Sequence, residues 1–296
     1  MKQHSAPKKQ GLYSPSNEHD SCGVGFVANS KGVKSHKIVA QGLEILTNLT
    51  HRGATGYDPK LGDGAGILIQ TPDALFQKEI KDLDFKIPAV GKYGVGMIFL
   101  PQDVNSRKIC EKIISDVIAE EDQAELGWRD VPVENKSIAI PAKEVEPVIR
   151  QVFIGQNDSL SSQNAFERKL FVIRKIIENL ILSLEISDPA NFYITSMSSR
   201  TIIYKGMLLA NEVGKYFPDL LDQTCQSALA LVHQRFSTNT FPSWDLAHPF
   251  RMIAHNGEIN TVKGNENWIT ARHEKMKSLL LGDDLEKLWP LISEGQ

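Results

Sequence analysis

The alternation of apolar and polar positions divides the chain into blocks of strands and helices. Strand patterns cover residues 22–32, 66–70, 93–100, 192–199, 201–208 and 229–238, and residues 251–260 are predicted as a strand with a turn. Helical spacing of apolar residues predicts helices over residues 38–49, 104–118, 166–184 and 265–280. An Asn-Ser-Lys-Gly turn ends the first strand and is typical of a hairpin. Repeated βαβ units are not evident, so we predict an α+β fold of antiparallel sheets with helices layered outside.

The first 21 residues differ in composition from the rest of the chain. They contain only two large apolar side chains, Leu12 and Tyr13, among Lys, Gln, Ser, Pro and Asn. They lack the apolar stretch of a secretory signal, and with no arginine and two acidic residues they make a poor organelle transit peptide. We therefore expect residues 1–21 to be a tail or a pro-segment removed before Cys22, and we expect a cytoplasmic protein.

Charge and composition exclude several function classes. The chain carries 33 Lys and Arg against 36 Asp and Glu, a net charge of −3, so it lacks the basic excess of a nucleic-acid-binding surface. No apolar run reaches the roughly 18 residues needed to span a membrane. The three cysteines, Cys22, Cys110 and Cys225, are odd in number and widely spaced, which argues against a disulfide framework and favours a reducing compartment.

Two patterns could suggest a bound metal or phosphate. The turn Gly-Asp-Gly-Ala-Gly at residues 62–66 completes neither common phosphate-binding motif, and a glycine-rich turn is a common structural device. His233, His248 and His255 match no standard metal spacing, and their strand positions suit hydrogen-bonded core histidines at least as well. We predict no metal site.

Cys22 is the most informative single residue because it lies at the change in composition. A lone cysteine is most often a buried structural thiol. If the chain is cut between Ser21 and Cys22, however, one residue carries both a thiol with a pKa of about 8.5 and an α-amine with a pKa of about 7.7 to 8.0. That amine is a competent base for the thiol, so Cys22 could act as an amide-attacking nucleophile without a separate histidine.

Such a nucleophile needs donors for the oxyanion that forms when it attacks a carbonyl. Asn256 offers a side-chain N–H and Gly257 a backbone N–H in the sequence His-Asn-Gly-Glu-Ile. Asn-Gly is also the strongest short signal for a hairpin turn. Both interpretations stay open from these residues alone.

Four segments together resemble the class II glutamine amidotransferase domain of glutamate synthase large subunits. They are CGVGFVA (22–28), LTNLTHRGATGYDPKLGDGAGILIQTP (46–72), FYITSMSSRTIIYKG (192–206) and HQRFSTNTFPSWDLAHPFRMIAHNGEINTVKGNENW (233–268). The resemblance implies that residues 22–296 form a type 2 glutamine amidotransferase domain. It also implies a four-layer αββα sandwich of two antiparallel sheets between helical layers, as in N-terminal-nucleophile hydrolases.

The resemblance implies a role for each residue at a matching position. Cys22 corresponds to the nucleophile, Asn256 and Gly257 to the oxyanion hole, and Arg235 to the arginine that holds the α-carboxylate of L-glutamine. Arg52 corresponds to a supporting arginine near the nucleophile. The products would be glutamate and ammonia. The family's aspartate for the substrate amine would follow Gln296, and Asp283 and Asp284 are the fallback candidates within the chain.

The resemblance also implies a longer parent enzyme. No cofactor is expected in this chain, whereas FMN and an iron-sulfur cluster are expected in later synthase domains, where the ammonia would reach 2-oxoglutarate. The implied partners are those domains and a small electron-donating subunit.

Two alternatives to an amidotransferase with a terminal cysteine remain. One is a Cys-His amide hydrolase that pairs Cys22 with His255 or His233 and needs no processing. The other is a catalytically silent module that binds glutamine.

Overall fold

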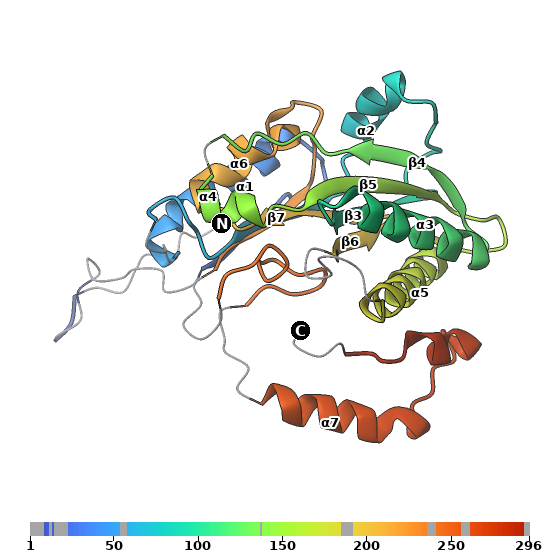
Figure 1. Ribbon diagram of the computed structural model, residues 1–296. Coiled ribbons are helices and arrows are strands. Elements are labelled where there is room, and N and C mark those ends of the chain that lie inside the picture. Colours follow the sequence, from blue (N-terminus) through green and yellow to red (C-terminus); the bar gives the residue numbers. More distant parts are fainter. Residues whose placement is uncertain are drawn as a thin grey trace.

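The computed structural model describes residues 9–11, 14, 23–53, 58–136, 138–184, 192–235, 241–255 and 261–292. Within these residues, eight strands form two antiparallel four-stranded sheets (Figure 1). The first sheet has the order β1-β8-β2-β7, and its strands are β1 (Val24–Ala28), β8 (Leu229–Gln234), β2 (Ala65–Gln70) and β7 (Thr201–Gly206). The second has the order β4-β5-β3-β6, and its strands are β4 (Ala124–Asp130), β5 (Val148–Gly155), β3 (Tyr93–Leu100) and β6 (Tyr193–Ser198).

The longer helices pack on these sheets. Helix α1 (His36–Asn48) lies on the first sheet, and a Cβ at its Gly42 would come within 2.7 Å of the Ala230 side chain of β8. Helices α3 (Val104–Glu120) and α5 (Gln163–Leu182) run side by side on the second sheet (Figure 1). The Asp103 carboxylate caps α3 by accepting from the Ser106 N–H at 2.7 Å, and the Ser162 hydroxyl caps α5.

Shorter helices complete the described fold: α2 (Asp73–Glu79), α4 (Ile140–Glu144), α6 (Val213–Tyr216) and α7 (Val262–Arg272). Helix α7 has no buried residue, and in Figure 1 it lies apart from both sheets. None of the described helices is long and apolar enough to cross a membrane.

Two apolar clusters show how the layers are held together. The larger contains side chains of both sheets, including Ile67 of β2, Val95 of β3 and Phe153 of β5, so the sheets share one core. The second lies between the second sheet and the pair α3 and α5. The expected α+β sandwich of antiparallel sheets and helices, typical of N-terminal-nucleophile hydrolases, is therefore confirmed.

Most predicted elements are present, but several pairings differ from those that local sequence suggests. The turn after β1 exists, with the Gly32 N–H donating to the Asn29 carbonyl at 2.9 Å, yet the expected hairpin is wrong. Strand β1 pairs instead with β8, some 200 residues later, with Val24 opposite His233. Strands β6 and β7 are consecutive but belong to different sheets.

Two missed strands and two boundaries also need correction. The sequence interpretation missed β4 and β5, and it extended the last helix to residue 280, whereas α7 spans Val262–Arg272. In the described part of the strand and turn expected at 251–260, the turn is present at 251–252, and the strand is reduced to an isolated bridge between Phe250 and Ile253. Residues 256–260, and most of the segment 1–21, lie outside the described residues.

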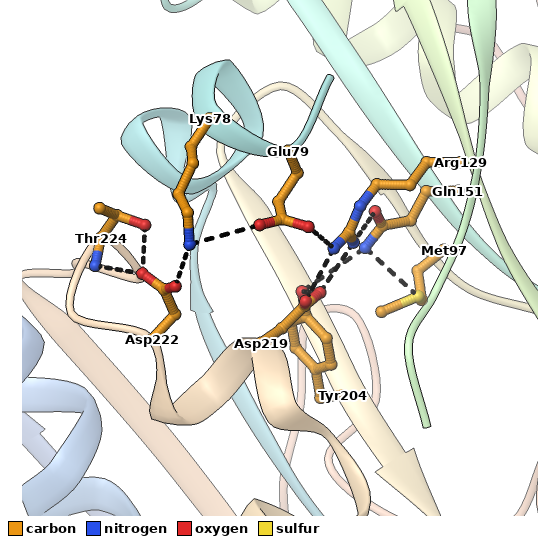
Figure 2. Close-up of polar contacts among 9 residues, drawn as sticks. All are labelled: Lys78, Glu79, Met97, Arg129, Gln151, Tyr204, Asp219, Asp222 and Thr224. Carbon is orange, nitrogen blue, oxygen red and sulfur yellow. Dashed lines mark hydrogen bonds and ion pairs between the residues drawn. The ribbon is translucent and has the colours of Figure 1, made fainter. Parts of the chain in front are cut away.

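A buried ion-pair network joins the two sheets (Figure 2). The Arg129 guanidinium of β4 donates to both carboxylate oxygens of Asp219 at 2.8 Å, and the two residues are only 5% and 4% exposed. The Tyr204 hydroxyl of β7 donates to the same carboxylate at 2.9 Å, and Arg129 also donates to Gln151 of β5 at 3.0 Å. Each buried polar group thereby finds a partner, as a stable buried network requires.

We expect Arg129→Met to lower the free energy of unfolding by about 3 to 5 kcal/mol, because it leaves the Asp219 carboxylate buried without its cation. Urea denaturation measures the change. Adding Asp219→Asn should recover part of the loss by removing that charge. Lys112→Met is the matched control, since the Lys112–Asp116 pair is 74% and 51% exposed and should contribute under about 1 kcal/mol. A loss below about 1 kcal/mol for Arg129→Met would contradict the expectation.

Candidate functional site

The candidate site forms where β8 ends between β1 and β2. The Gln234 N–H donates to the Gly23 carbonyl at 2.7 Å, and the Arg235 N–H donates to the Gly64 carbonyl at 2.8 Å. Antiparallel pairing on both sides of β8 therefore brings residues 23, 64 and 235 to one end of the first sheet. Three of the four segments singled out from the sequence, 22–28, 46–72 and 233–268, meet at this point.

Arg235 is a largely buried cation at this end of the sheet. The residue is 9% exposed, and its Nη1 donates to the Asp63 carbonyl at 3.2 Å. Burial lowers the pKa of the guanidinium from its usual value, and the nearby Asp63 and Asp245 oppose that effect. An arginine remains charged in any protein environment, so the site contains a fixed positive charge.

Arg52 and Gly53 lie against the same strand end. A Cβ at Gly53 would collide with the Gln234 side chain, so the backbone of residue 53 packs directly on β8. Arg52, in the short 3-10 helix Thr50–Arg52, has a buried Nε with no hydrogen-bond partner among the described residues. The buried side-chain oxygen of Gln234 also has no hydrogen-bond partner among the described residues. Unsatisfied buried polar atoms are uncommon and are frequently found at functional sites.

The glycine-rich turn at 62–66 serves close packing. Gly64 has φ +130°, and a Cβ there would lie 2.8 Å from the Ala247 side chain. A Cβ at Gly62 would lie 2.6 Å from the Leu208 carbonyl oxygen. The turn is therefore filled by neighbouring chain, which supports its interpretation as a structural device.

The three histidines cluster beside the strand end. The His233 Nε2 lies 2.8 Å from the His255 carbonyl oxygen, and because a carbonyl only accepts, Nε2 must carry the proton. The rings of His233 and His248 stack with centroids 4.3 Å apart, and His248 meets His255 edge to face at 5.3 Å. Among the described residues, no group of three or more His, Cys, Asp or Glu is arranged to hold a metal ion.

His248 is held neutral at physiological pH. Burial, together with the nearby His233 and Lys205, lowers the pKa of His248 from 6.5 to about 3. The imidazole therefore cannot add a second charge next to Arg235.

Three of the predicted site residues, Cys22, Asn256 and Gly257, lie outside the described residues. Their sequence neighbours are described: Gly23 is bonded to Gln234, and His255 is bonded to His233. The fallback carboxylate Asp284 forms ion pairs with Lys169 at 2.7 Å and Lys287 at 2.8 Å, on the short helix Gly282–Leu288. Asp283 is exposed on the same turn.

The sequence interpretation did not single out Gln234 or Lys205. Gln234 follows His233 directly and contacts both Gly23 and Gly53. Lys205 is 1% exposed on β7, opposite Gly66. A charged residue inside an otherwise apolar strand pattern is the signal that could have identified Lys205.

The sequence profile of the family described as "Glutamine amidotransferases class-II" matches residues 22–296. The chain is 48% identical over 293 residues to the glutamate synthase [NADPH] large chain of Bacillus subtilis, which covers 99% of this chain and 19% of that relative. It is 45% identical to the glutamate synthase [NADH] of Saccharomyces cerevisiae, covering 98% and 14%. It is 41% identical to the ferredoxin-dependent glutamate synthase of Pyropia yezoensis, covering 96% and 18%. The chain thus spans about a fifth or less of the length of these relatives.

We expect His248 to make folding stability depend on pH. Its folded pKa of about 3 lies below the ordinary 6.5, so between these values the unfolded chain binds a proton that the native protein does not. The free energy of unfolding therefore decreases as the pH falls from 6.5 toward 3, by at most about 1.4 kcal/mol per pH unit. Urea denaturation at pH 4.5, 5.5 and 7 should show a smaller slope for His248→Gln than for the wild type. Equal slopes would show that His248 is protonated in the native state.

Proposed function

Because this chain belongs to the class-II glutamine amidotransferases, we propose that it hydrolyses the side-chain amide of L-glutamine to glutamate and ammonia, with Cys22 as the nucleophile. We further propose that it does so as the N-terminal part of a glutamate synthase. The relatives include proteins named for NADPH, NADH and ferredoxin, all above 40% identity. The proposal for the glutaminase part therefore does not depend on the electron donor.

The observation that carries the proposal is the double pairing of β8. Gly23, bonded to Gln234, is covalently attached to Cys22, and consecutive Cα atoms are about 3.8 Å apart. Arg235 directly follows β8, and its backbone N–H is bonded to the Gly64 carbonyl. The attachment point of the nucleophile and the cation for the substrate thus lie next to the paired ends of two neighbouring strands.

The proposed reaction starts from a processed chain with Cys22 at its terminus. The α-amine accepts the thiol proton, and the Cys22 sulfur attacks the carboxamide carbon of glutamine. Side-chain N–H of Asn256 and backbone N–H of Gly257 stabilise the oxyanion. The C–N bond then breaks, the amine returns the proton to the leaving group, and ammonia departs. Water cleaves the γ-glutamyl thioester, which releases glutamate and restores the thiol.

Arg235 and Arg52 are the proposed contacts for the substrate. The guanidinium geometry of Arg235 suits a carboxylate through two parallel hydrogen bonds. Its burial would strengthen that interaction by excluding water. Arg52 contributes a buried Nε that lacks a partner among the described residues, and we assign it a supporting role beside the nucleophile.

The other two cysteines favour Cys22 as the nucleophile. Burial raises the pKa of Cys110 to about 11 and that of Cys225 to about 12, so both thiols are protonated at neutral pH. Protonated, buried thiols are poor nucleophiles.

The described cysteines and the glycine-rich turn do not favour a cofactor site in this part of the chain. Cys110 of α3 lies in the core between the second sheet and the pair α3 and α5, whereas Cys225 lies in the core shared by the two sheets. The glycine-rich turn at 62–66 packs against Leu208 and Ala247 and completes neither common phosphate-binding motif. We propose that FMN, the iron-sulfur cluster and the contacts with a small electron-donating subunit belong to the part of a glutamate synthase that this chain does not cover.

We expect active protein to begin at Cys22, because only a terminal cysteine has a free α-amine to act as base. Intact-mass spectrometry and a glutamate-release assay on the same preparation test this. Cys22→Ala should abolish glutamine hydrolysis, whereas Cys110→Ala should retain it. Ser21→Pro should retain residues 1–21 and lose activity. Full activity of an uncleaved chain would favour the Cys-His alternative, and glutamine binding without turnover in the processed wild type would favour the silent module.

We expect Asn256→Ala to lower kcat about 10²- to 10³-fold with little change in the KM for glutamine, because an oxyanion donor acts mainly on charge that develops in the transition state. Arg235→Lys is the contrasting variant and should raise KM, because it removes the two-pronged contact to the substrate carboxylate. Steady-state kinetics separate the two effects. A near-normal kcat in Asn256→Ala would identify residues 256 and 257 as a simple hairpin turn.

A further inference from the structure

Lys205 is a buried lysine whose cost to folding needs an explanation. It is 1% exposed on β7, and among the described residues no carboxylate lies within ion-pair distance of it. Its Nζ donates to the backbone carbonyl of Asp245 at 2.7 Å. The same Nζ lies 4.5 Å from the Tyr193 ring centroid and 4.4 Å from that of Phe250. Lys205 therefore holds the segment 241–255 at two points, through a carbonyl and through a ring.

Arg251 ties the same segment to the other sheet. Its Nη1 donates to the Ile194 carbonyl of β6 at 2.7 Å and approaches the Tyr193 hydroxyl at 3.1 Å. The guanidinium carbon also lies 5.4 Å from the Tyr193 ring centroid. Lys205 thus ties the segment to β7 and Arg251 ties it to β6, and these two strands belong to different sheets.

The segment 241–255 has little regular structure of its own. It contains one isolated bridge, between Phe250 and Ile253. At its end the His255 carbonyl accepts from His233 of β8, and the chain then continues directly into Asn256 and Gly257. The course of the chain up to Asn256 therefore depends on side-chain ties from the sheets rather than on a helix or strand.

Stability alone does not account for a lysine at position 205. Burial, reinforced by Arg251, lowers its pKa well below the usual value, which reflects how poorly this environment suits an ammonium group. A methionine would fill similar space without that desolvation cost. What a lysine adds is a hydrogen-bond donor long enough to reach Asp245 from β7.

We propose that Lys205 is a positioning residue for glutamine hydrolysis, which holds the segment 241–255 so that the chain that continues from it brings Asn256 and Gly257 to the oxyanion. The proposal rests on the proposed function of the site. Lys205 acts here through the backbone of Asp245 and the ring of Phe250, so its proposed role is to position the segment rather than to act on the substrate. Its loss should therefore impair the chemical step while sparing glutamine binding through Arg235.

The test is Lys205→Met in the processed protein, with Lys215→Met as the control, since Lys215 is an exposed lysine on α6 with a side chain 62% exposed. We expect Lys205→Met to lower kcat about 10- to 100-fold, as small misplacements of catalytic groups do, with KM for glutamine changed less than about threefold. Its Tm should equal or exceed that of the wild type. The alkylation rate of Cys22 by iodoacetamide, which needs no oxyanion donor, should remain normal. Lys215→Met should leave all four quantities unchanged.

The outcomes separate the two proposals. If the wild type hydrolyses glutamine and folded Lys205→Met has a normal kcat, the positioning role is wrong and the proposed function stands. If the wild type itself neither hydrolyses glutamine nor reacts at Cys22, the proposed function fails. If Lys205→Met does not fold, the deciding variant is Arg251→Met, which removes the tie to β6 and changes a side chain that is partly exposed. A loss of kcat without a change in KM then supports the positioning of the segment 241–255 by its ties to the sheets, and a normal kcat overturns it.

Discussion

The pairing of β8 with two strands at once is the constraint on which the site depends. Strand β8 forms antiparallel ladders with β1 and with β2, and its last residues bond to Gly23 and Gly64. Side chains alternate between the faces of a sheet, so a slip of one residue would turn His233 and Arg235 to the opposite sides. The two ladders fix the register, and the register brings three distant segments of the chain to one point.

Buried basic side chains have two different kinds of hydrogen-bond acceptor in this protein, carboxylates and backbone carbonyls. Arg129 and Asp219 form a two-pronged ion pair in which every partner is satisfied, and they connect the second sheet to the region beside β7 (Figure 2). Near the candidate site, the buried side chains of Arg235 and Lys205 donate to the backbone carbonyls of Asp63 and Asp245. His248 beside them stays neutral at physiological pH and adds no positive charge next to Arg235.

The sequence was sufficient wherever local pattern and final burial agree. Strand β3 matches its predicted range, since all eight of its residues are buried and its apolar run is uninterrupted. Strands β4 and β5 were missed because Arg129 and Gln151 are polar residues at core-facing positions, which breaks the expected alternation. Those residues are tolerated only because Asp219 and Tyr204 supply partners from distant parts of the chain.

The sequence by itself determined the family, the α+β class and the candidate residues Cys22, Arg52, Arg235, Asn256 and Gly257, because long motifs and hydrophobic periodicity are local properties. Only the tertiary structure decided that β1 pairs with β8 rather than in a hairpin, and that β6 and β7 separate into different sheets. It alone revealed Lys205 and Arg251 as ties on the segment before Asn256. Strand partners and side-chain ties between distant segments depend on how the whole core closes, and no window of local sequence contains that information.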